Sequence, residues 1–235
     1  MALGFKNKKT DGLIPVEEEK KEIRKIVSIA GPRADELVYI TAKLLGHGTL
    51  PILIIDNTPD HILFRAVGHE KEEDAVYEKN LTVVKNAAFT DRLLESFNFV
   101  VVYHGIYPDK TWWDHSDLMF IITDFERFPM EDLGQRLRGM TLNNVGLILK
   151  GRYLEKIHDT LIPEVLGLPE EALEIAEEIP ADERAEAVRL MFQYDGTLKL
   201  QTLPKEIKEA AYAMYKLTAE PDKKEKMASV FSEAD

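Results

Sequence analysis

The chain has 235 residues, of which 42 are acidic and 30 basic, and it carries a net charge of −12 and no cysteine. This charge argues against a nucleic-acid partner, because phosphate contacts need lysine and arginine; the missing cysteines exclude disulfides and thiolate metal sites and fit a cytoplasmic protein. No apolar run approaches the roughly 18 residues that cross a bilayer, and the length fits one α/β domain.

The first 22 residues are polar and include a charge run, so a flexible N-terminal arm is predicted at 1–22. Apolar, β-branched runs of strand length then recur at 25–29, 51–55, 81–84, 99–103, 118–123 and 145–149. Most of these runs are continuous rather than alternating, which is typical of strands buried on both faces of a parallel sheet.

Helical patterns separate these runs, at 37–45, 61–67, 89–96, 130–138, 153–161 and 185–192. A further helix is predicted at 203–217, with Pro204 in its first turn. Strand alternating with helix predicts a doubly wound three-layer sandwich with a mostly parallel sheet, formed by one domain at 23–219. The charged segment 220–235 is interpreted as a solvated, partly frayed tail. Its alternative is a short amphipathic helix that contacts a membrane surface or a partner.

The loop after the first predicted strand has the layout of a P-loop without its chemistry. An apolar run ends at Gly31 and an amphipathic stretch follows. A P-loop holds phosphates and Mg²⁺ with glycine N–H groups, a lysine and a hydroxyl. The segment that follows Gly31 instead reads Pro32, Arg33, Ala34, Asp35, Glu36, Leu37 and Val38.

Over residues 23–219 the chain resembles the MinD/ParA family of deviant Walker A ATPases, including its CpaE/TadZ branch. The family motif S-G-K-G-G-x-G-K-T-T aligns with this loop without a gap. Gly31 matches the first glycine, and Pro32 stands at the signature lysine. Leu37 stands at the phosphate-binding lysine and Val38 at the first hydroxyl. The resemblance therefore implies a P-loop fold whose nucleotide site is degenerate.

A second segment looks like the family's D-x-D-P switch, which follows the next strand. Asp56 and Pro59 are kept, whereas Thr58 replaces the aspartate that orients the attacking water in active members.

Three further segments resemble family landmarks in the expected order. Tyr103 occupies the position of the Walker B aspartate, and Lys150 replaces the asparagine that reads the base. The segment 178–183 is similar to the I-P-x-D loop over the adenine, and its Asp182 is intact. Four groups of nucleotide-handling residues are thus altered on a recognisable framework.

The altered loop argues against hydrolysis, which depends on charge compensation at the phosphates. Asp35 and Glu36 add negative charge where Mg·ATP would lie, and one charge pair at about 4 Å and a dielectric of about 20 is worth roughly 4 kcal/mol. Their alternative interpretation is the acidic first turn of a helix, with Leu37 or Val38 facing the interior. Arg33 is interpreted as a surface or salt-bridging side chain; its alternative is a contact to phosphate.

The leading hypothesis is a non-catalytic pseudo-ATPase, without cofactor, that acts as an adaptor, localisation or assembly factor. The CpaE/TadZ resemblance suggests a pilus, secretion or conjugation system. Because relatives form face-to-face dimers, the resemblance also implies a homodimer through 32–36, 58–61 and 103–113. The surface residues expected there are Arg33, Asp35, Glu36, His61, His104, Trp112 and Trp113.

Two alternatives remain. One is an ATP-binding switch, with Mg·ATP as cofactor, that uses Arg33 and Asp56. The other is a metal-dependent hydrolase at the carboxyl edge of the sheet. Its candidate ligands are Asp56, His61, His104, Asp114, His115 and Asp117. They show no recognised ligand spacing, so solvated loop residues are the preferred interpretation.

The adjacent tryptophans Trp112 and Trp113 would point to opposite sides of an extended segment. We therefore expect one in the core and one exposed, where it could anchor a protein partner.

Overall fold

The computed structural model of the chain describes residues 24–47, 50–68, 74–124, 126–151, 161–180, 183–221 and 225–235. The predicted arm at 1–22 and Asp182 lie outside these ranges, as does all but the last residue of the helix predicted at 153–161.

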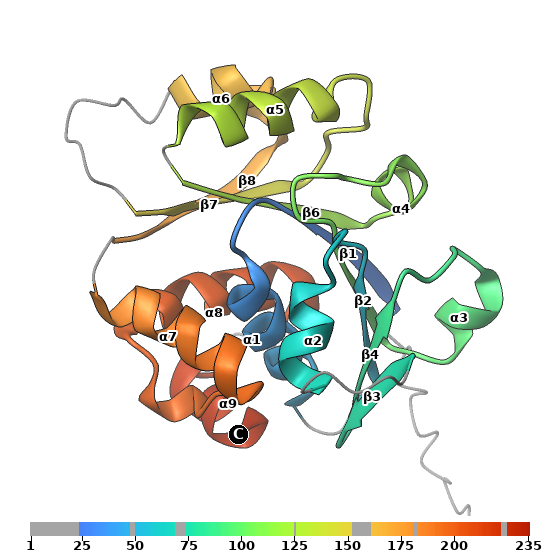
Figure 1. Cartoon of the computed structure of the whole chain (residues 1–235), viewed down its shortest axis with the longest axis vertical. Helices are drawn as coiled ribbons and strands as arrows, with labels where there is room; N and C mark the ends of the chain where they lie inside the picture. The colour runs from blue at the N-terminus through green and yellow to red at the C-terminus, as the bar shows by residue number, and fades with distance from the viewer. Residues whose placement is uncertain are drawn as a thin grey trace, which may run out of the picture.

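The strands of the described residues form one sheet in the order β3-β4-β2-β5-β1-β6-β7-β8 (Figure 1). All neighbours are parallel except β3 and β4. The strands are β1 (Lys25–Ala30), β2 (Ile52–Asp56), β3 (Ala75–Glu78), β4 (Leu81–Lys85), β5 (Phe99–Tyr103), β6 (Leu118–Thr123), β7 (Val145–Lys150) and β8 (Leu173–Ile179). The six predicted strands are confirmed to within one residue at each end, whereas β3 and β8 were not predicted.

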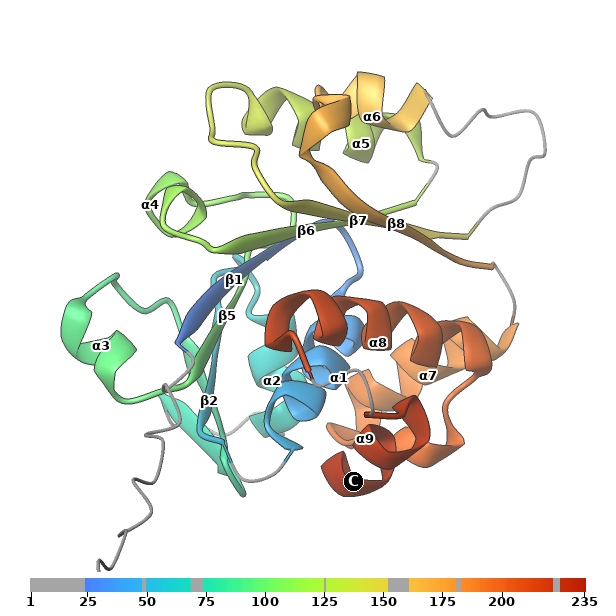
Figure 2. The same cartoon turned by 180° about the vertical axis from the view of Figure 1, so that it is seen from behind.

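Helices cover both faces of the sheet, as the two opposite views show (Figures 1 and 2). One face carries α1 (Asp35–Leu45), α2 (Ile62–Gly68), α7 (Glu183–Asp195), α8 (Lys205–Ala219) and α9 (Met227–Ala234). The other carries α3 (Asp91–Glu95), α4 (Lys110–Asp114), α5 (Arg127–Leu137) and α6 (Leu161–Leu166). Short 3₁₀ turns lie at η2 (Glu170–Ala172) and η3 (Leu200–Thr202). The predicted three-layer sandwich is confirmed. Helix α8 begins directly after Pro204, which stands at the N-cap position instead of in the first turn.

The central strands are mostly apolar because both of their faces are buried. In β1, Val27 and Ile29 pack under α1 and α8, whereas Ile26 and Ala30 belong to clusters on the opposite face. This arrangement is what continuous apolar runs predict for a parallel sheet.

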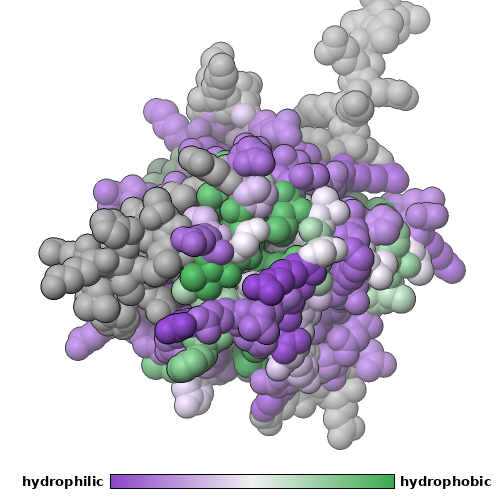
Figure 3. Space-filling model, turned by 90° about the horizontal axis from the view of Figure 1, so that it is seen from above, coloured by the Kyte–Doolittle hydropathy of each residue, from purple (hydrophilic) through white to green (hydrophobic). Residues whose placement is uncertain are grey.

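The α5–α6 pair covers the β6–β7 side of the sheet. A Cβ atom at Gly134 of α5 would lie 2.5 Å from the Val165 carbonyl oxygen, so the close approach of the two helices requires glycine there. Figure 3 looks down on this face, where apolar residues gather in the middle and polar residues surround them.

No helix in the described ranges is long and apolar enough to cross a membrane.

The C-terminal segment ends in a docked helix. α9 buries Val230 and Phe231 against α1 and η3 (Figure 2). The Asp235 side chain accepts a hydrogen bond from the Leu200 N–H at 2.8 Å. The interpretation of 220–235 as a frayed tail is therefore wrong for α9. Because its apolar face packs inward, the docked helix has no apolar face to offer a membrane.

Candidate functional site

Parallel strands end at the same edge of the sheet, and this edge collects the altered residues. Asp56 ends β2, Tyr103 ends β5, Lys150 ends β7, and Gly31 directly follows β1. The order of strands reverses at β1, whose neighbours are β5 and β6, and ligands of doubly wound folds bind at such a switch point.

Gly31 fixes the loop between β1 and α1 against the sheet. Its φ is +140°, and its N–H donates to the Gly105 carbonyl oxygen at 2.7 Å. A Cβ atom at this position would lie 1.6 Å from the carbonyl oxygen of Ile122. Packing against β6 and the positive φ therefore both require glycine.

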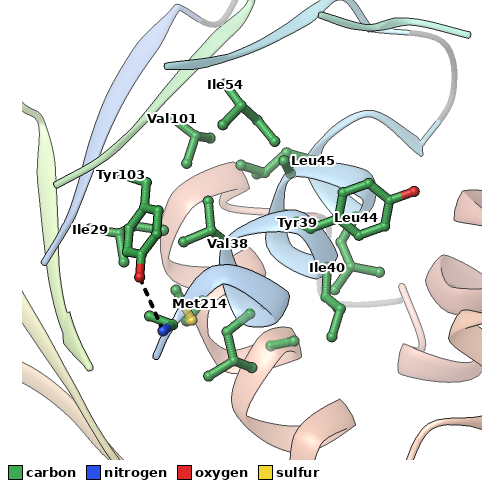
Figure 4. Close-up of a cluster of buried hydrophobic side chains, with 14 of the residues drawn as sticks. Ile29, Val38, Tyr39, Ile40, Leu44, Leu45, Ile54, Val101, Tyr103 and Met214 are labelled. Carbon is green, nitrogen blue, oxygen red and sulfur yellow. Dashed lines mark hydrogen bonds between the residues drawn. The ribbon is translucent and has the colours of Figure 1, made fainter. Parts of the chain in front are cut away.

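Tyr103 reaches the same loop from β5 (Figure 4). Its hydroxyl accepts a hydrogen bond from the Ala34 N–H at 3.2 Å and donates to the Gly31 carbonyl oxygen at 3.5 Å. Burial raises the pKa of Tyr103 well above its usual value, with the nearby Asp35 carboxylate adding to the shift, so the hydroxyl stays protonated. The Ala34 N–H belongs to the loop whose amides bind phosphate in a P-loop, and here it is hydrogen-bonded within the chain instead.

Lys150 forms the second closing contact. Its ammonium lies 2.5 Å from Glu36 Oε1 and 2.6 Å from the Arg33 carbonyl oxygen, and so joins the end of β7 to the start of α1. The Glu36 side chain is 1% exposed, and its Oε2 has no hydrogen-bond partner among the described residues. Burial raises the pKa of Glu36, and the charge of Lys150 offsets part of that rise.

Two further charged side chains near the loop also have partners within the chain. The buried Asp35 carboxylate accepts a hydrogen bond from Gln193 Nε2 at 3.2 Å. Arg189 of α7 binds Glu186 at 2.5 Å. The Arg33 side chain is exposed, as expected for a surface residue, and its φ is +53°.

Mg·ATP does not fit the residues at this position. The Gly31 and Ala34 N–H groups already have partners within the chain, and Leu37 and Val38 are fully buried apolar side chains of α1. The lysine and hydroxyl groups of α1 bind elsewhere, Tyr39 and Lys43 to Glu78 and Thr41 to Met214. Two buried carboxylates, Asp35 and Glu36, begin the helix instead.

The segment that resembles the family's switch, which begins at Asp56, also forms hydrogen bonds within the chain. Asp56 Oδ1 accepts hydrogen bonds from the N–H and the hydroxyl of Thr58, at 3.0 and 2.6 Å. Its Oδ2 accepts one from the Phe64 N–H at 2.9 Å, inside the first turns of α2. Both oxygens of this buried carboxylate therefore hold the loop and helix in place.

Comparison with known proteins identifies the architecture. No family model and no curated protein matches the sequence. MinD cell division protein of Aquifex aeolicus matches the structure with a TM-score of 0.61 at 15% identity, over 86% of this chain and 99% of that one. The chain has the fold of MinD.

Two other solved structures agree with this assignment. The MinC:MinD complex of A. aeolicus matches with a TM-score of 0.58 at 15% identity, over 83% of this chain and 95% of that one. A putative plasmid partition protein of Borrelia burgdorferi bound to AMPPNP matches at 0.54 and 15% identity, over 84% of this chain and 99% of that one. The predicted MinD/ParA-like P-loop fold is thereby confirmed, and the likeness concerns the fold alone.

Most residues expected on the dimer surface of this MinD-like fold are buried. Asp35, Glu36 and His104 are at most 2% exposed. Trp112 and Trp113 are equally buried, so the prediction of one exposed tryptophan is wrong. The pair lies on helix α4 rather than on an extended segment, and each indole N–H donates to a backbone carbonyl oxygen. Of the predicted surface residues only Arg33 is exposed, and His61 is partly so.

The candidate metal ligands do not converge. Asp117 Oδ2 accepts a hydrogen bond from the Ile26 N–H, as expected for a structural aspartate. Asp114 binds Lys110, and His115 bonds to the Thr111 carbonyl oxygen. In the described part of the chain no three His, Asp or Glu side chains form a group that could hold a metal ion.

A buried polar chain links β1 to the loops after β5 and α4, and sequence spacing did not reveal it. The Asp109 N–H donates to His104 Nδ1, so the proton of the neutral imidazole lies on Nε2. Nε2 lies 3.0 Å from Ser28 Oγ, and Ser116 Oγ is 2.8 Å from Ser28 Oγ. His104 and Ser28 are fully buried, which makes this arrangement a structural one and not an activated nucleophile.

Acid is expected to destabilise the protein through His104. Burial lowers the pKa of His104 from 6.5 to about 4, so the unfolded chain takes up this proton at a higher pH than the folded chain. Above pH 6.5 His104 is neutral in both states and does not lower the free energy of unfolding. As the pH falls to about 4, the free energy of unfolding drops by about 3 kcal/mol.

Urea unfolding of the wild type and of His104→Gln across this range tests the prediction. The variant should lose less stability on acidification, whereas the exposed-site control His115→Gln should follow the wild type. Equal acid sensitivity of wild type and His104→Gln would contradict the prediction.

Proposed function

We propose that the chain is a pseudo-ATPase with the MinD/ParA fold that works without nucleotide, as a protein–protein adaptor, localisation or assembly factor. The observation that carries the proposal is the bridge from Lys150 to Glu36 and the Arg33 carbonyl oxygen. This bridge uses an internal cation to close the edge at which the fold would hold a nucleotide. The Tyr103 hydrogen bond to the Ala34 N–H supports the same conclusion.

The ATP-switch alternative has less support. It needs Asp56 for Mg²⁺ and Arg33 for phosphate, but both Asp56 oxygens accept hydrogen bonds from the chain's own groups. Arg33 alone would face two buried carboxylates of α1. Charge compensation, on which phosphoryl transfer depends, is therefore missing.

The proposed adaptor role draws on two further lines of support. One solved structure with this fold is a MinC:MinD complex, which shows that the fold can present a surface to another protein. The sequence resemblance to the CpaE/TadZ branch extends the proposal to a pilus, secretion or conjugation system in the cytoplasm. The net charge of −12 favours a protein partner over a nucleic acid.

Calorimetric titration of the purified chain with Mg·ATP tests the proposal. We expect no binding heat up to millimolar nucleotide, in the presence or absence of Mg²⁺. The plasmid partition protein of B. burgdorferi, titrated with Mg·AMPPNP, is the positive control because its solved structure holds that nucleotide. Micromolar binding by the present chain would refute the pseudo-ATPase assignment.

A further inference from the structure

Helix α7 lies on the outside of the helical layer (Figure 1), and it exposes a strip of apolar side chains. Leu190, Met191 and Tyr194 are 41%, 55% and 82% exposed. Their neighbour Ala187 is exposed as well. The inward side of the same helix packs against the core, where Val188 and Phe192 are buried. Apolar side chains that gather on one exposed surface are typical of protein–protein contacts.

The strip has the spacing of a helix-pairing seam. Four exposed positions, Glu183, Ala187, Leu190 and Tyr194, follow one another at intervals of four, three and four residues. This is the alternation of a and d positions in a heptad, which places the four side chains along one line of the helix. Met191 widens the strip on one side.

The seam is complementary to itself when two copies run in opposite directions. Antiparallel pairing about a two-fold axis places the small Ala187 opposite the larger Leu190, and the Glu183 carboxylate opposite the Tyr194 hydroxyl. On the flank of the seam it brings Arg184 near Asp195 of the other copy, which are unlike charges. Parallel pairing would instead place Glu183 against Glu183.

We propose that α7 is a self-association surface and that its occupant is α7 of a second copy of this chain, packed antiparallel. The dimer is isologous, so each copy contributes the same strip. This inference deepens the proposed function by naming a partner. The proposed dimer contact lies on the outer face of α7, not on the largely buried residues of the nucleotide edge. On the inner side of α7, Gln193 donates a hydrogen bond to Asp35.

The expected dimer is weak. One 13-residue helix covers less than the roughly 800 Å² per partner of a standard interface, and two chains of net charge −12 repel each other. Salt screens that repulsion beyond about 8 Å at physiological ionic strength. Dissociation in the micromolar range is therefore expected, and it should tighten as salt is raised from low to physiological concentration.

Sedimentation equilibrium of the full chain without nucleotide tests the self-association. We expect a monomer–dimer equilibrium for the wild type, and at least about tenfold weaker dimerisation for Leu190→Glu, which places a charge in the seam. The matched control is Phe128→Glu on α5, where a side chain 80% exposed lies on the opposite layer. That control should leave the equilibrium unchanged.

A wild type that stays monomeric to hundreds of micromolar would overturn the proposal, as would equal effects of the two variants. Either failure would leave the nucleotide titration unaffected, so the two hypotheses fail separately.

Disulfide cross-linking tests the antiparallel register, since the chain has no native cysteine. We expect an equimolar mixture of Glu183→Cys and Tyr194→Cys chains to form a cross-linked dimer, and neither variant to do so alone. In the proposed register, like positions lie about 16 Å apart along the helix, beyond the roughly 7 Å that a disulfide allows between Cα atoms. Replacing Glu183→Cys by Phe128→Cys in the mixture should abolish the product. Cross-linking of Glu183→Cys alone would overturn the antiparallel arrangement.

Discussion

Replacing Lys150 with methionine is expected to destabilise the fold by about 3–5 kcal/mol, because removing one partner of a buried ion pair leaves the other charge uncompensated. The charge left behind is the Glu36 carboxylate, which is 1% exposed and already has one oxygen without a partner. Burial would then raise the pKa of Glu36 without the offset that Lys150 provides. The loss should be largest at alkaline pH and should shrink as the pH falls through that raised pKa toward 4.5, where the group is protonated.

Urea unfolding of three variants separates this effect from a general surface effect. Lys110→Met removes an exposed lysine that also forms an ion pair, with Asp114, and should change stability little. The double variant Glu36→Leu with Lys150→Met removes both charges and should recover most of the loss, since apolar replacements of buried ion pairs are often neutral. If Lys150→Met costs no more than Lys110→Met, the bridge does not close the site as described.

Truncating Phe231 to alanine is expected to cost about 3–5 kcal/mol, the usual range for a large aromatic side chain in a core. Phe231 is 2% exposed in α9 and belongs to the same cluster as α1 and α8. The cost would be smaller if α9 detaches as a unit, so hydrogen exchange should accompany the unfolding measurement. Fast exchange of the 227–234 amides in the variant, with slow exchange in the wild type, would identify that route.

Ser232→Ala is the matched control, because Ser232 is the exposed neighbour of Phe231 on the same helix. It should leave both the free energy of unfolding and the exchange rates unchanged. Unprotected α9 amides in the wild type would contradict the docked helix.

The centre of the fold was predictable because its strands are mostly apolar. Strands such as β5, with five buried residues in succession, have a sequence signal that depends only on burial. The two edge strands lack that signal. In β8 three glutamates interrupt the apolar residues, and in β3 Tyr77 is 75% exposed. Charged and exposed side chains are what unpaired edges carry, so apolar runs alone could not find them.

For a different reason, α4 was not predicted, and α9 was only the alternative to a frayed tail. Asp109 accepts a hydrogen bond from the Trp112 N–H, which is the N-cap signature of α4 and was present in the sequence. In α9 the residues Met227, Val230, Phe231 and Ala234 recur at helical spacing. That pattern predicts an apolar face, but the surface that covers the face comes from α1 and η3, far away in the chain.

The sequence indicated where the candidate site lies, but not what its side chains contact. The altered positions Tyr103 and Lys150 stand out against the family motifs. What they contact depends on residues more than 65 positions away, since Tyr103 binds the Ala34 N–H and Lys150 binds the Glu36 carboxylate. For the same reason the polar chain of Ser28, His104 and Ser116 has no local signature, although each member was visible as a residue.

We propose that the chain's own side chains close the edge at which this MinD-like fold would hold a nucleotide. Crystals of the full chain grown in millimolar Mg·AMPPNP test it most directly. We expect no phosphate or magnesium density at the start of α1, with Lys150 bound to Glu36 and the Tyr103 hydroxyl at the Ala34 N–H, as in the present structure. Density for AMPPNP against the Gly31–Ala34 loop, with Lys150 displaced from Glu36, would contradict it.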